Sequence, residues 1–303
     1  MTSDASETFQ TAKVTQQDQI GLYVQEQAKL YDKWVIALGG RQDFVSSDTN
    51  NIVAGTSQDS DASKFSGRAG LVYLADNGLA PYFSYTQSFL PVVGTDSSGG
   101  VLQPETGEQY EIGVKYQPSG VDSFITASAF DLTRQNVVSI NPATFASVQT
   151  GEQRSRGFEL EAVGSFLDSA LNITAAYTYQ YVEITKSIAG DEGNRPLGVP
   201  EQLAAIYADY TIPGGALRGL GFGLGVTYQG SISGGSLDGD PANTFEVDGF
   251  TLVDAAVHYD WRKLRLPSMC RTCSTTNILT SVSMPASVCW HRPNRGGYCA
   301  LQL

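Results

Sequence analysis

The chain has 303 residues, a formal net charge of −12, 17% charged residues and 41% hydrophobic residues. The acidic balance argues against a nucleic-acid partner, because phosphate binding needs clustered Lys and Arg side chains. No run of about 18 apolar residues is present, which excludes a transmembrane helix. A low charge content combined with 32 Gly and 15 Tyr predicts a β protein with many turns.

The residues that follow Met1 lack the basic start and the apolar run of a secretory leader. A cytoplasmic protein would begin in this way, and so would a piece of a longer chain that starts upstream. The strand pattern of the body favours the second explanation. We therefore expect residues 1–17 to form a short lead-in, the remnant of an extracellular loop.

Apolar and polar residues alternate between Ile20 and Tyr259 in segments of about ten, the length of a membrane-spanning strand. Successive side chains of a strand point to opposite faces, so each segment has one apolar and one polar face. Helical spacing is not sustained over a comparable length. In chain order, the clearest apolar faces are Tyr110, Ile112, Val114 and Tyr116; Leu171, Ile173, Ala175, Tyr177, Tyr179 and Tyr181; Ala204, Ile206, Ala208, Tyr210 and Ile212; Phe222, Leu224, Val226 and Tyr228; and Val253, Ala255, Val257 and Tyr259.

The connections between these segments alternate between short and long. Short turns rich in Gly, Pro, Asn and Asp are expected at residues 31–33, 75–78, 117–120, 166–169 and 213–215. Long polar connections are expected at residues 45–63, 91–106, 134–154, 187–200 and 231–248. Every second connection of an up-and-down antiparallel barrel lies on the same rim. The alternation therefore predicts one rim of turns and one rim of long loops.

These patterns together predict an all-β fold, an antiparallel transmembrane β-barrel, in which every backbone group finds a partner inside the bilayer. About twelve strands are expected, with one more possible, so the chain would form part of a larger barrel. The alternative is a soluble β-sandwich, whose strands also alternate but are usually shorter. Aromatic residues at strand ends fit the interfacial girdles of a membrane barrel, namely Trp34, Tyr73, Tyr116, Tyr181, Tyr210, Tyr228 and Tyr259.

Seven ordered segments of the body carry a family resemblance. They are SGRAGLVYLADNGLAPYFSYTQSF from Ser66, LQPETGEQYEIGVKYQP from Leu102, SAFDLTRQNV from Ser128, QTGEQRSRGFELEAVGS from Gln149, LNITAAYTYQYVEIT from Leu171, NRPLGVPEQLAAIYADYTI from Asn194 and GFGLGVTYQG from Gly221. Together they resemble the barrel of TonB-dependent siderophore receptors of the ferrichrome type. The resemblance covers about residues 18–261, and we take residues 18–262 as the barrel region.

The resemblance implies a receptor in the outer membrane of a Gram-negative bacterium. Such receptors are barrels of about 22 strands with a plug domain in the lumen. They bind a ferric siderophore, here a ferrichrome-like hydroxamate, and the TonB complex pulls on the plug to release it inward. They are transporters rather than enzymes, and the Fe(III)-siderophore is a ligand rather than a cofactor. The expected partners are therefore the siderophore, outer-membrane lipid and the TonB complex.

The same resemblance implies that this chain corresponds to the C-terminal part of a receptor. The signal peptide, the plug and roughly the first ten strands of the family's barrel would be absent. Contact with TonB would then run through a plug that is not part of these residues. A passive porin, or another outer-membrane barrel without energised transport, is the alternative function.

Residues 263–303 depart from the family pattern. All four cysteines, Cys270, Cys273, Cys289 and Cys299, fall in this tail. The family would continue with a strand and a motif like NVQNLFDKxY. Suitable codons for residues 269–278, translated from the third nucleotide, give such a motif, and we therefore expect the tail to be out of frame. A zinc site formed by the cysteines with His291 matches no compact ribbon spacing, so no metal site is expected.

No catalytic constellation is expected either. Asp254 and His258 share a strand face, but no G-x-S-x-G elbow supplies a nucleophile. Tyr85 and Phe89 lead into a long connection and are the candidates for facing the ligand, with a place in the aromatic girdle as the alternative. The polar strand faces should line the lumen and contact the plug through hydrogen bonds and ion pairs, through Arg41, Arg68, Gln109, Glu111, Lys115, Glu159 and Glu161.

Overall fold

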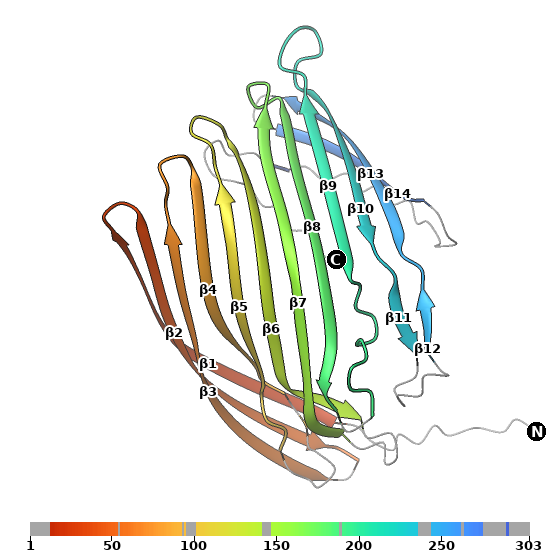
Figure 1. Cartoon of the computed structure of the whole chain (residues 1–303). Coiled ribbons are helices and arrows are strands. Elements are labelled where there is room, and N and C mark those ends of the chain that lie inside the picture. The colour runs from red at the N-terminus through yellow and green to blue at the C-terminus, as the bar shows by residue number, and fades with distance from the viewer. Residues whose placement is uncertain are drawn as a thin grey trace, which may run out of the picture.

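The computed structural model describes residues 13–53, 55–92, 94, 101–140, 147–187, 190–235, 244–261, 264–274 and 289–290. Every element in these ranges is a β-strand (Figure 1). The described part of the chain contains no helix long and apolar enough to cross a membrane.

Thirteen strands form one antiparallel sheet in chain order, and two more form a separate ribbon. The ribbon pairs β11 (Ile232–Gly235) with β12 (Thr244–Val247). The sheet strands are β1 (Lys13–Leu30), β2 (Trp34–Asn51), β3 (Thr56–Tyr73), β4 (Leu79–Leu90), β5 (Glu105–Tyr116), β6 (Ser123–Ile140), β7 (Ser147–Phe166), β8 (Leu171–Lys186), β9 (Gln202–Thr211), β10 (Leu220–Gln229), β13 (Phe250–Trp261), β14 (Leu264–Ser274) and β15 (Cys289–Trp290).

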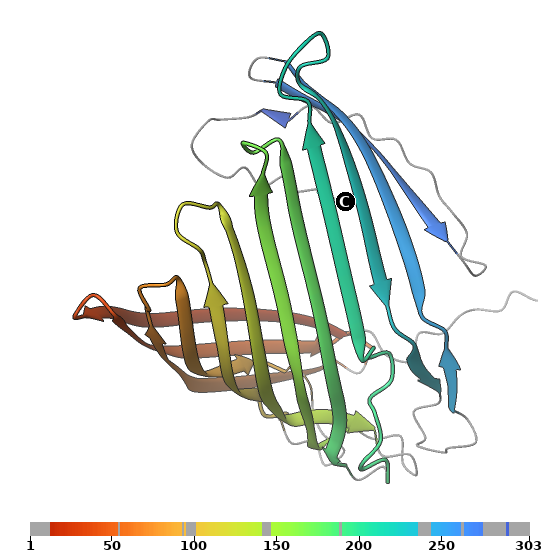
Figure 2. The same cartoon turned by 45° about the horizontal axis from the view of Figure 1, so that its top comes forward.

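The sheet is a curved wall that does not close on itself. β1 stands at one end and β15 at the other, and each has a neighbour on one side only among the described residues. Figures 1 and 2 show that the wall is curved, with one concave and one convex face. The predicted all-β, partial barrel is confirmed, and the strand number agrees with the expected count.

The strands are strongly staggered, as a tilted barrel requires. We follow one line across the sheet by going from each residue to the residue directly opposite it on the next strand. This line starts at Lys29, close to the turn end of β1. It passes through Val72 on β3 and Glu159 on β7. It ends at Phe250, the first residue of β13, at the loop end. A closed barrel needs this stagger because its strands tilt by roughly 35–45° from the axis.

The predicted short turns gather at one edge of the wall, at the top of Figure 1. In the three-residue connection between β1 and β2, Tyr31 and Asp32 adopt φ values of 50° and 55°, the positive values that tight hairpin turns use. Gly78 has a φ of 86°, and a Cβ there would overlap the carbonyl oxygen of Gln117 in the next turn. The turn edge is therefore closely packed, and glycine is required at position 78.

Two of the predicted long connections are wrong in extent. Residues 45–63 belong mostly to strands, because β2 continues to Asn51 and β3 begins at Thr56. The connection predicted at residues 134–154 is shorter for the same reason, because β6 continues to Ile140 and β7 begins at Ser147. The ends of β2 and β3 in this region are mostly polar on both faces, so no apolar alternation marks them. They pair through the backbone and through side chains such as Thr15 and Thr49, whose hydroxyl oxygens are 3.0 Å apart.

The other connections agree better with the prediction. β4 ends at Leu90 and β5 begins at Glu105, while β8 ends at Lys186 and β9 begins at Gln202. The connection from β10 to β13 contains the β11–β12 ribbon. At the start of the chain, β1 begins at Lys13, so part of residues 1–17 forms strand, and residues 1–12 lie outside the described residues.

The register places all five predicted apolar sets on one face of the sheet. For example, Ile112 opposes Ala129, and Tyr177 opposes Leu160 on one side and Ala204 on the other. Large apolar side chains of this face are exposed, including Ile112 at 65% and Leu224 at 56%. Of the described residues, only four apolar ones are buried. A β-sandwich would bury such a face against a second sheet, so this alternative is wrong.

Candidate functional site on the polar face of the sheet

The opposite face, here called the polar face, carries many of the charged and amide side chains of the wall. Directly opposite residues of neighbouring strands point to the same face of a sheet. The register, in which Gly39 opposes Arg68, Ser84 opposes Glu111 and Ser128 opposes Glu159, therefore brings the residues predicted on polar strand faces to this one face. The full predicted set on this face is Arg41, Arg68, Gln109, Glu111, Lys115, Glu159, Glu161, Asp254 and His258.

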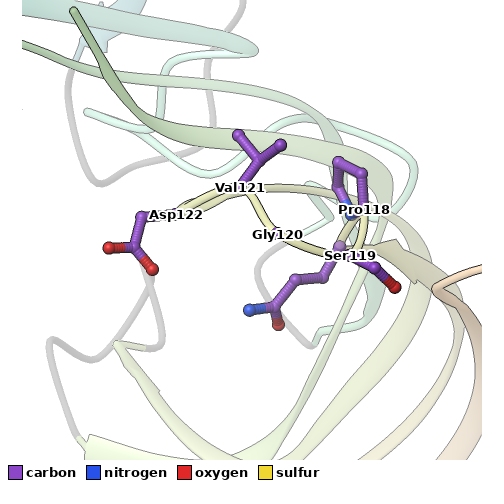
Figure 3. A pocket seen from close by; sticks show the side chains of 6 residues that line it. Pro118, Ser119, Gly120, Val121 and Asp122 are labelled. Carbon is purple, nitrogen blue, oxygen red and sulfur yellow. The ribbon is translucent and has the colours of Figure 1, made fainter. Parts of the chain in front are cut away.

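The turn edge contains a hollow of about 590 Å³ formed by the β5–β6 connection (Figure 3). Residues 117–122 line it. The side chains of Pro118 and Val121 lie on one side of this loop, and the carboxylate of Asp122 projects on the other. Only one charged side chain faces this hollow, and it lies at the end opposite to the long connections. We therefore place the candidate site elsewhere, on the polar face of the wall itself.

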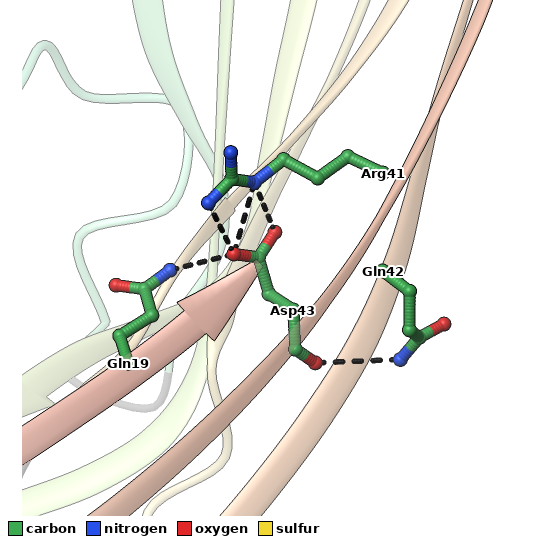
Figure 4. Close-up of polar contacts among 4 residues, drawn as sticks. All are labelled: Gln19, Arg41, Gln42 and Asp43. Carbon is green, nitrogen blue, oxygen red and sulfur yellow. Dashed lines mark hydrogen bonds and ion pairs between the residues drawn. The ribbon is translucent and has the colours of Figure 1, made fainter. Parts of the chain in front are cut away.

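A buried carboxylate organises the polar face at β1 and β2 (Figure 4). Asp43 is only 2% exposed. Arg41 donates to both of its oxygens, from Nε at 2.8 and 3.0 Å and from Nη2 at 2.8 Å. Gln19 donates to the same carboxylate at 2.8 Å. The forked pair neutralises Asp43 and fixes the direction of the Arg41 guanidinium.

A second network crosses β4 and β5 in the middle of the wall. The Tyr82 hydroxyl donates to Oε1 of Glu111 at 2.6 Å, and the Gln109 amide donates to Oε2 at 3.0 Å. The Tyr82 ring lies flat over Gly113, where a Cβ would come within 2.6 Å of the ring. Glycine on the neighbouring strand thus lets a large side chain lie along the wall rather than project from it.

The imidazole of His258 is held near the turn edge. It is 5% exposed, with Nε2 3.1 Å from the Thr211 hydroxyl and Nδ1 3.4 Å from the Asp209 carboxylate. A Cβ on Gly221 would overlap this ring. Alternation along the chain places Asp209 on the polar face, but only the pairing of β9, β10 and β13 brings it to His258. These contacts fix the position of the His258 ring on the polar face, which fits a structural role in the barrel wall.

The two candidate ligand residues lie on the apolar face. Tyr85 packs its ring against Tyr110, with centroids 5.0 Å apart. Phe89 opposes Thr106 on the same face, four residues further along β4. Both side chains share the face of Phe83, because alternate residues of a strand point the same way. This placement fits the girdle alternative, and a ligand role for Tyr85 and Phe89 stays a prediction.

The described residues contain no group of three or more His, Cys, Asp or Glu side chains that could hold a metal ion. Cys270, Cys273 and Cys289 lie in strands, but the described side chains do not include theirs. His291 and Cys299 lie outside the described residues. The expected absence of a zinc site in residues 263–303 therefore stays a prediction.

Comparison with known protein families identifies the family to which this curved sheet belongs. The family model described as TonB dependent receptor-like, beta-barrel, matches residues 2–268. The chain belongs to this receptor family. Its members are receptors and transporters rather than enzymes, in agreement with the expectation from the sequence.

Similar curated members of the TonB-dependent receptors are siderophore receptors. The chain is 42% identical over 248 residues to the ferrichrome outer membrane transporter/phage receptor of Escherichia coli K12, which covers 82% of this chain and 32% of that protein. It is 35% identical over 260 residues to the ferrioxamine B receptor of Salmonella typhimurium LT2, covering 86% and 36%. The chain thus spans about a third of the length of these TonB-dependent receptors.

Solved structures of TonB-dependent receptors share the fold. The siderophore receptor PiuA from Acinetobacter baumannii matches with a TM-score of 0.68 and 24% identity, over 84% of this chain and 38% of that one. The unliganded ferric citrate transporter FecA matches with a TM-score of 0.69 and 21% identity, over 88% and 42%. These likenesses support the assignment of the curved sheet as a barrel wall.

Proposed function

We propose that this chain forms part of an outer-membrane receptor that transports a ferric siderophore, a ferrichrome-like hydroxamate, with energy delivered by the TonB complex. The observation that carries the proposal is the 42% identity to the ferrichrome transporter along 82% of the chain. The two-faced sheet supports it, because a lipid-facing apolar surface and a polar lumen are what an outer-membrane receptor needs.

In this proposal the polar face is the inner lining of the transport path. Several of its charged side chains are paired within the wall, as Asp43 is with Arg41 and Glu105 is with Arg134. Pairing of this kind offsets the free-energy cost of placing charges on a partly buried polar lining. The siderophore would enter at the rim of long connections. The contact with TonB would be made by a plug domain, which we expect outside residues 18–262.

The division of the chain is also a proposal. We infer that residues 18–262 are the receptor barrel and that residues 263–303 are translated out of frame. On β14, the positions opposite Val257, Ala255 and Val253 are occupied by Ser268, Cys270 and Thr272. The apolar pattern of the neighbouring strands stops there. Sequencing the gene from codon 264 to codon 278 tests the idea, which fails if no other reading frame there encodes a motif like NVQNLFDKxY.

A chimeric receptor tests the proposed function. Residues 18–262 replace the matching barrel region of the Escherichia coli ferrichrome transporter, whose own plug, first strands and last strands are kept. We expect cells with this chimera as their only ferrichrome receptor to take up radiolabelled ferric ferrichrome, and to lose uptake when TonB is deleted. A chimera that reaches the outer membrane but shows no TonB-dependent uptake of ferrichrome or ferrioxamine contradicts the proposal.

The passive porin alternative makes a different prediction for the same cells. Passive diffusion would persist without TonB and would not saturate with ligand concentration. The DNA upstream of the chain gives an independent check, because a receptor gene has a plug-coding region there and a porin gene has none.

A further inference from the structure

Charged side chains of β1, β2 and β3 are sorted by sign between the two faces of the sheet. The ladders that join these strands have no register shift, so alternate residues of each strand share a face. The polar face carries five cations and one carboxylate, namely Lys13, Lys29, Arg41, Lys64, Arg68 and Asp43. The opposite face of the same three strands carries five carboxylates and no cation, namely Asp18, Glu26, Asp48, Asp59 and Asp61. The polar face is therefore positive here, although the whole chain is acidic.

Three of these cations occupy neighbouring rows of the sheet. Read from β1 through β2 to β3, the rows are Gln25–Gly39–Arg68, Tyr23–Arg41–Ser66 and Gly21–Asp43–Lys64. We call Arg41, Lys64 and Arg68 the cationic cluster. All three residues are exposed, so their charges can reach a partner that stands in front of the polar face.

Glycines on the neighbouring strands let the two arginines lie along the wall. A Cβ on Gly39 would come within 3.0 Å of Nε of Arg68, and a Cβ on Gly21 would overlap the guanidinium of Arg41. Arg68 donates to the side-chain oxygen of Gln25, and Arg41 is held by its forked ion pair on β2 (Figure 4). Both guanidinium groups are thus fixed before a partner arrives, which lowers the entropy cost of binding one.

The cationic cluster is not neutralised within the wall. Asp43 is the only carboxylate on the polar face of β1 to β3, and Arg41 donates to both of its oxygens. Among the described side chains, neither Lys64 nor Arg68 has a carboxylate within ion-pair distance, unlike Arg134 further along the wall. Three cations and one carboxylate leave two positive charges in excess. Such a surface is complementary to an anionic one.

A hollow of about 380 Å³ adjoins the cationic cluster. The residues that line it include Tyr23, Arg41, Ser66, Arg68 and Thr86. Their guanidinium and hydroxyl groups can donate hydrogen bonds, and none of the described residues that line this hollow carries a carboxylate. The hollow therefore suits a carboxylate that enters from the polar side.

The position of the cluster along the strands indicates what can reach it. Arg68 and Lys64 lie five and nine residues before Tyr73, the turn end of β3. Lys64 is also eight residues away from Thr56, the loop end of the same strand. The cluster therefore lies at a depth that the bilayer surrounds. A body that fills the lumen reaches this depth, whereas a ligand bound at the rim of long connections lies above it.

We propose that the cationic cluster is a docking surface for the plug domain, and that the side of the plug facing β1 to β3 carries carboxylates that enter the hollow beside Arg41 and Arg68. This inference rests on the proposed function, which supplies the plug as the body in the lumen. It adds the chemistry of one side of the plug, and with it the direction in which the plug faces. Forked guanidinium–carboxylate bonds are directional and strong where water is scarce.

Site-specific cross-linking in the chimeric receptor tests the docking surface. Ser66, directly opposite Arg41, is replaced by photoreactive p-benzoylphenylalanine, and Phe65, its neighbour on the opposite face, is the control position. We expect position 66 to cross-link to a plug segment that contains Asp or Glu, and position 65 to give no plug product. The proposal is overturned if position 66 gives no plug product, if it reaches only a segment without Asp or Glu, or if both positions react equally. The cross-links are formed in cells without TonB or siderophore, so a failure of transport rejects the proposed function separately.

Charge reversal supplies the second test. Seating of the plug is measured as its half-life against proteinase K, in purified chimeras whose barrels stay heat-resistant on gels. We expect Arg68→Glu to shorten this half-life by about tenfold or more, and Arg68→Lys to shorten it by less than about threefold. Changing the cross-linked plug carboxylate to Lys should restore the half-life of the Arg68→Glu chimera.

The control for charge reversal is Asp61→Lys, which lies on the opposite face of β3 and should leave the half-life of the plug unchanged. A plug that stays as resistant in the Arg68→Glu chimera as in the parent overturns the docking surface. Equal sensitivity of the Asp61→Lys chimera would show that the effect does not come from the polar face, and overturns it as well.

Discussion

Single glycines on the polar face decide how large side chains lie on the wall. His258 and Tyr82 each lie over a glycine of a neighbouring strand, Gly221 and Gly113 respectively. A methyl group at either position would push the ring toward the lumen and break its hydrogen bonds. The wall is therefore flat where its polar residues are largest.

Substitution of Gly221 by alanine tests this at one position. The new Cβ overlaps the His258 ring, so the bonds to Thr211 and Asp209 are lost. In the chimera, we expect Gly221→Ala to lower the free energy of unfolding in detergent by about 1–3 kcal/mol. Gly214→Ala is the matched control, because nothing lies within 4 Å of its Cβ. Equal denaturant midpoints for the two variants would show that the ring is not held as described.

Two carboxylates outside the membrane, Glu152 and Asp48, make the stability of the fold depend on pH in opposite directions. Lys186, whose ammonium nitrogen lies 2.7 Å from Glu152, lowers the pKa of that carboxyl from its usual 4.5, and Thr185 assists. A carboxyl group whose pKa is lowered by folding stabilises the fold at pH values above its unfolded-state pKa. This stabilisation is lost as the pH falls through the folded-state pKa. On β2, the neighbouring carboxylate of Asp59 raises the pKa of Asp48.

Two amide variants check these signs. We expect Glu152→Gln to be less stable than the parent at pH 7, by up to about 1 kcal/mol, and equally stable well below pH 4.5. We expect Asp48→Asn to be the more stable protein at pH 7, because it removes repulsion from Asp59, with the gain shrinking on acidification. Unfolding midpoints at several pH values measure both differences. The same sign for both variants would contradict the assignment.

At the scale of strands, the sequence predicted the faces well and the lengths poorly. The period of two in residues 171–181 and 222–228 placed the predicted apolar sets on the correct face, because the bilayer requires that alternation. The outer halves of β2 and β3 escaped detection because their residues are mostly polar on both faces, so no period of two marks them. The short β3–β4 ladder and the Asp209–His258 contact were also beyond prediction, since both depend on the register between strands.

Arginine substitutions on β10 test the two faces of one strand. Leu224 lies on the apolar face and is 56% exposed, whereas Thr227 lies on the polar face. In the chimera, we expect Leu224→Arg to destabilise the barrel by about 2–4 kcal/mol near the bilayer midplane. Thr227→Arg should be tolerated because its side chain faces water. Outer-membrane levels and unfolding midpoints of the two variants would be compared, and equal losses would argue against a lipid-facing Leu224.

At the scale of the whole molecule, the open edges of the wall matter most. The outer edge of β1 has no strand partner among the described residues, and bare backbone groups are prohibitive in lipid. We expect the 303-residue chain alone to fail to insert into liposomes as heat-resistant β-structure, and the chimera to succeed. A heat-resistant folded monomer of the chain alone would contradict this, as seen by gel mobility and circular dichroism.

The direct test of the account is the lipid contact of successive residues on β8. Ile173→Cys, Thr174→Cys, Ala175→Cys and Ala176→Cys are introduced singly into the chimera and labelled with a fluorophore in bilayers that contain a lipid-bound quencher. The account predicts strong quenching at positions 173 and 175 and weak quenching at positions 174 and 176. Uniform quenching, or the reverse alternation, would show that the apolar face does not contact lipid.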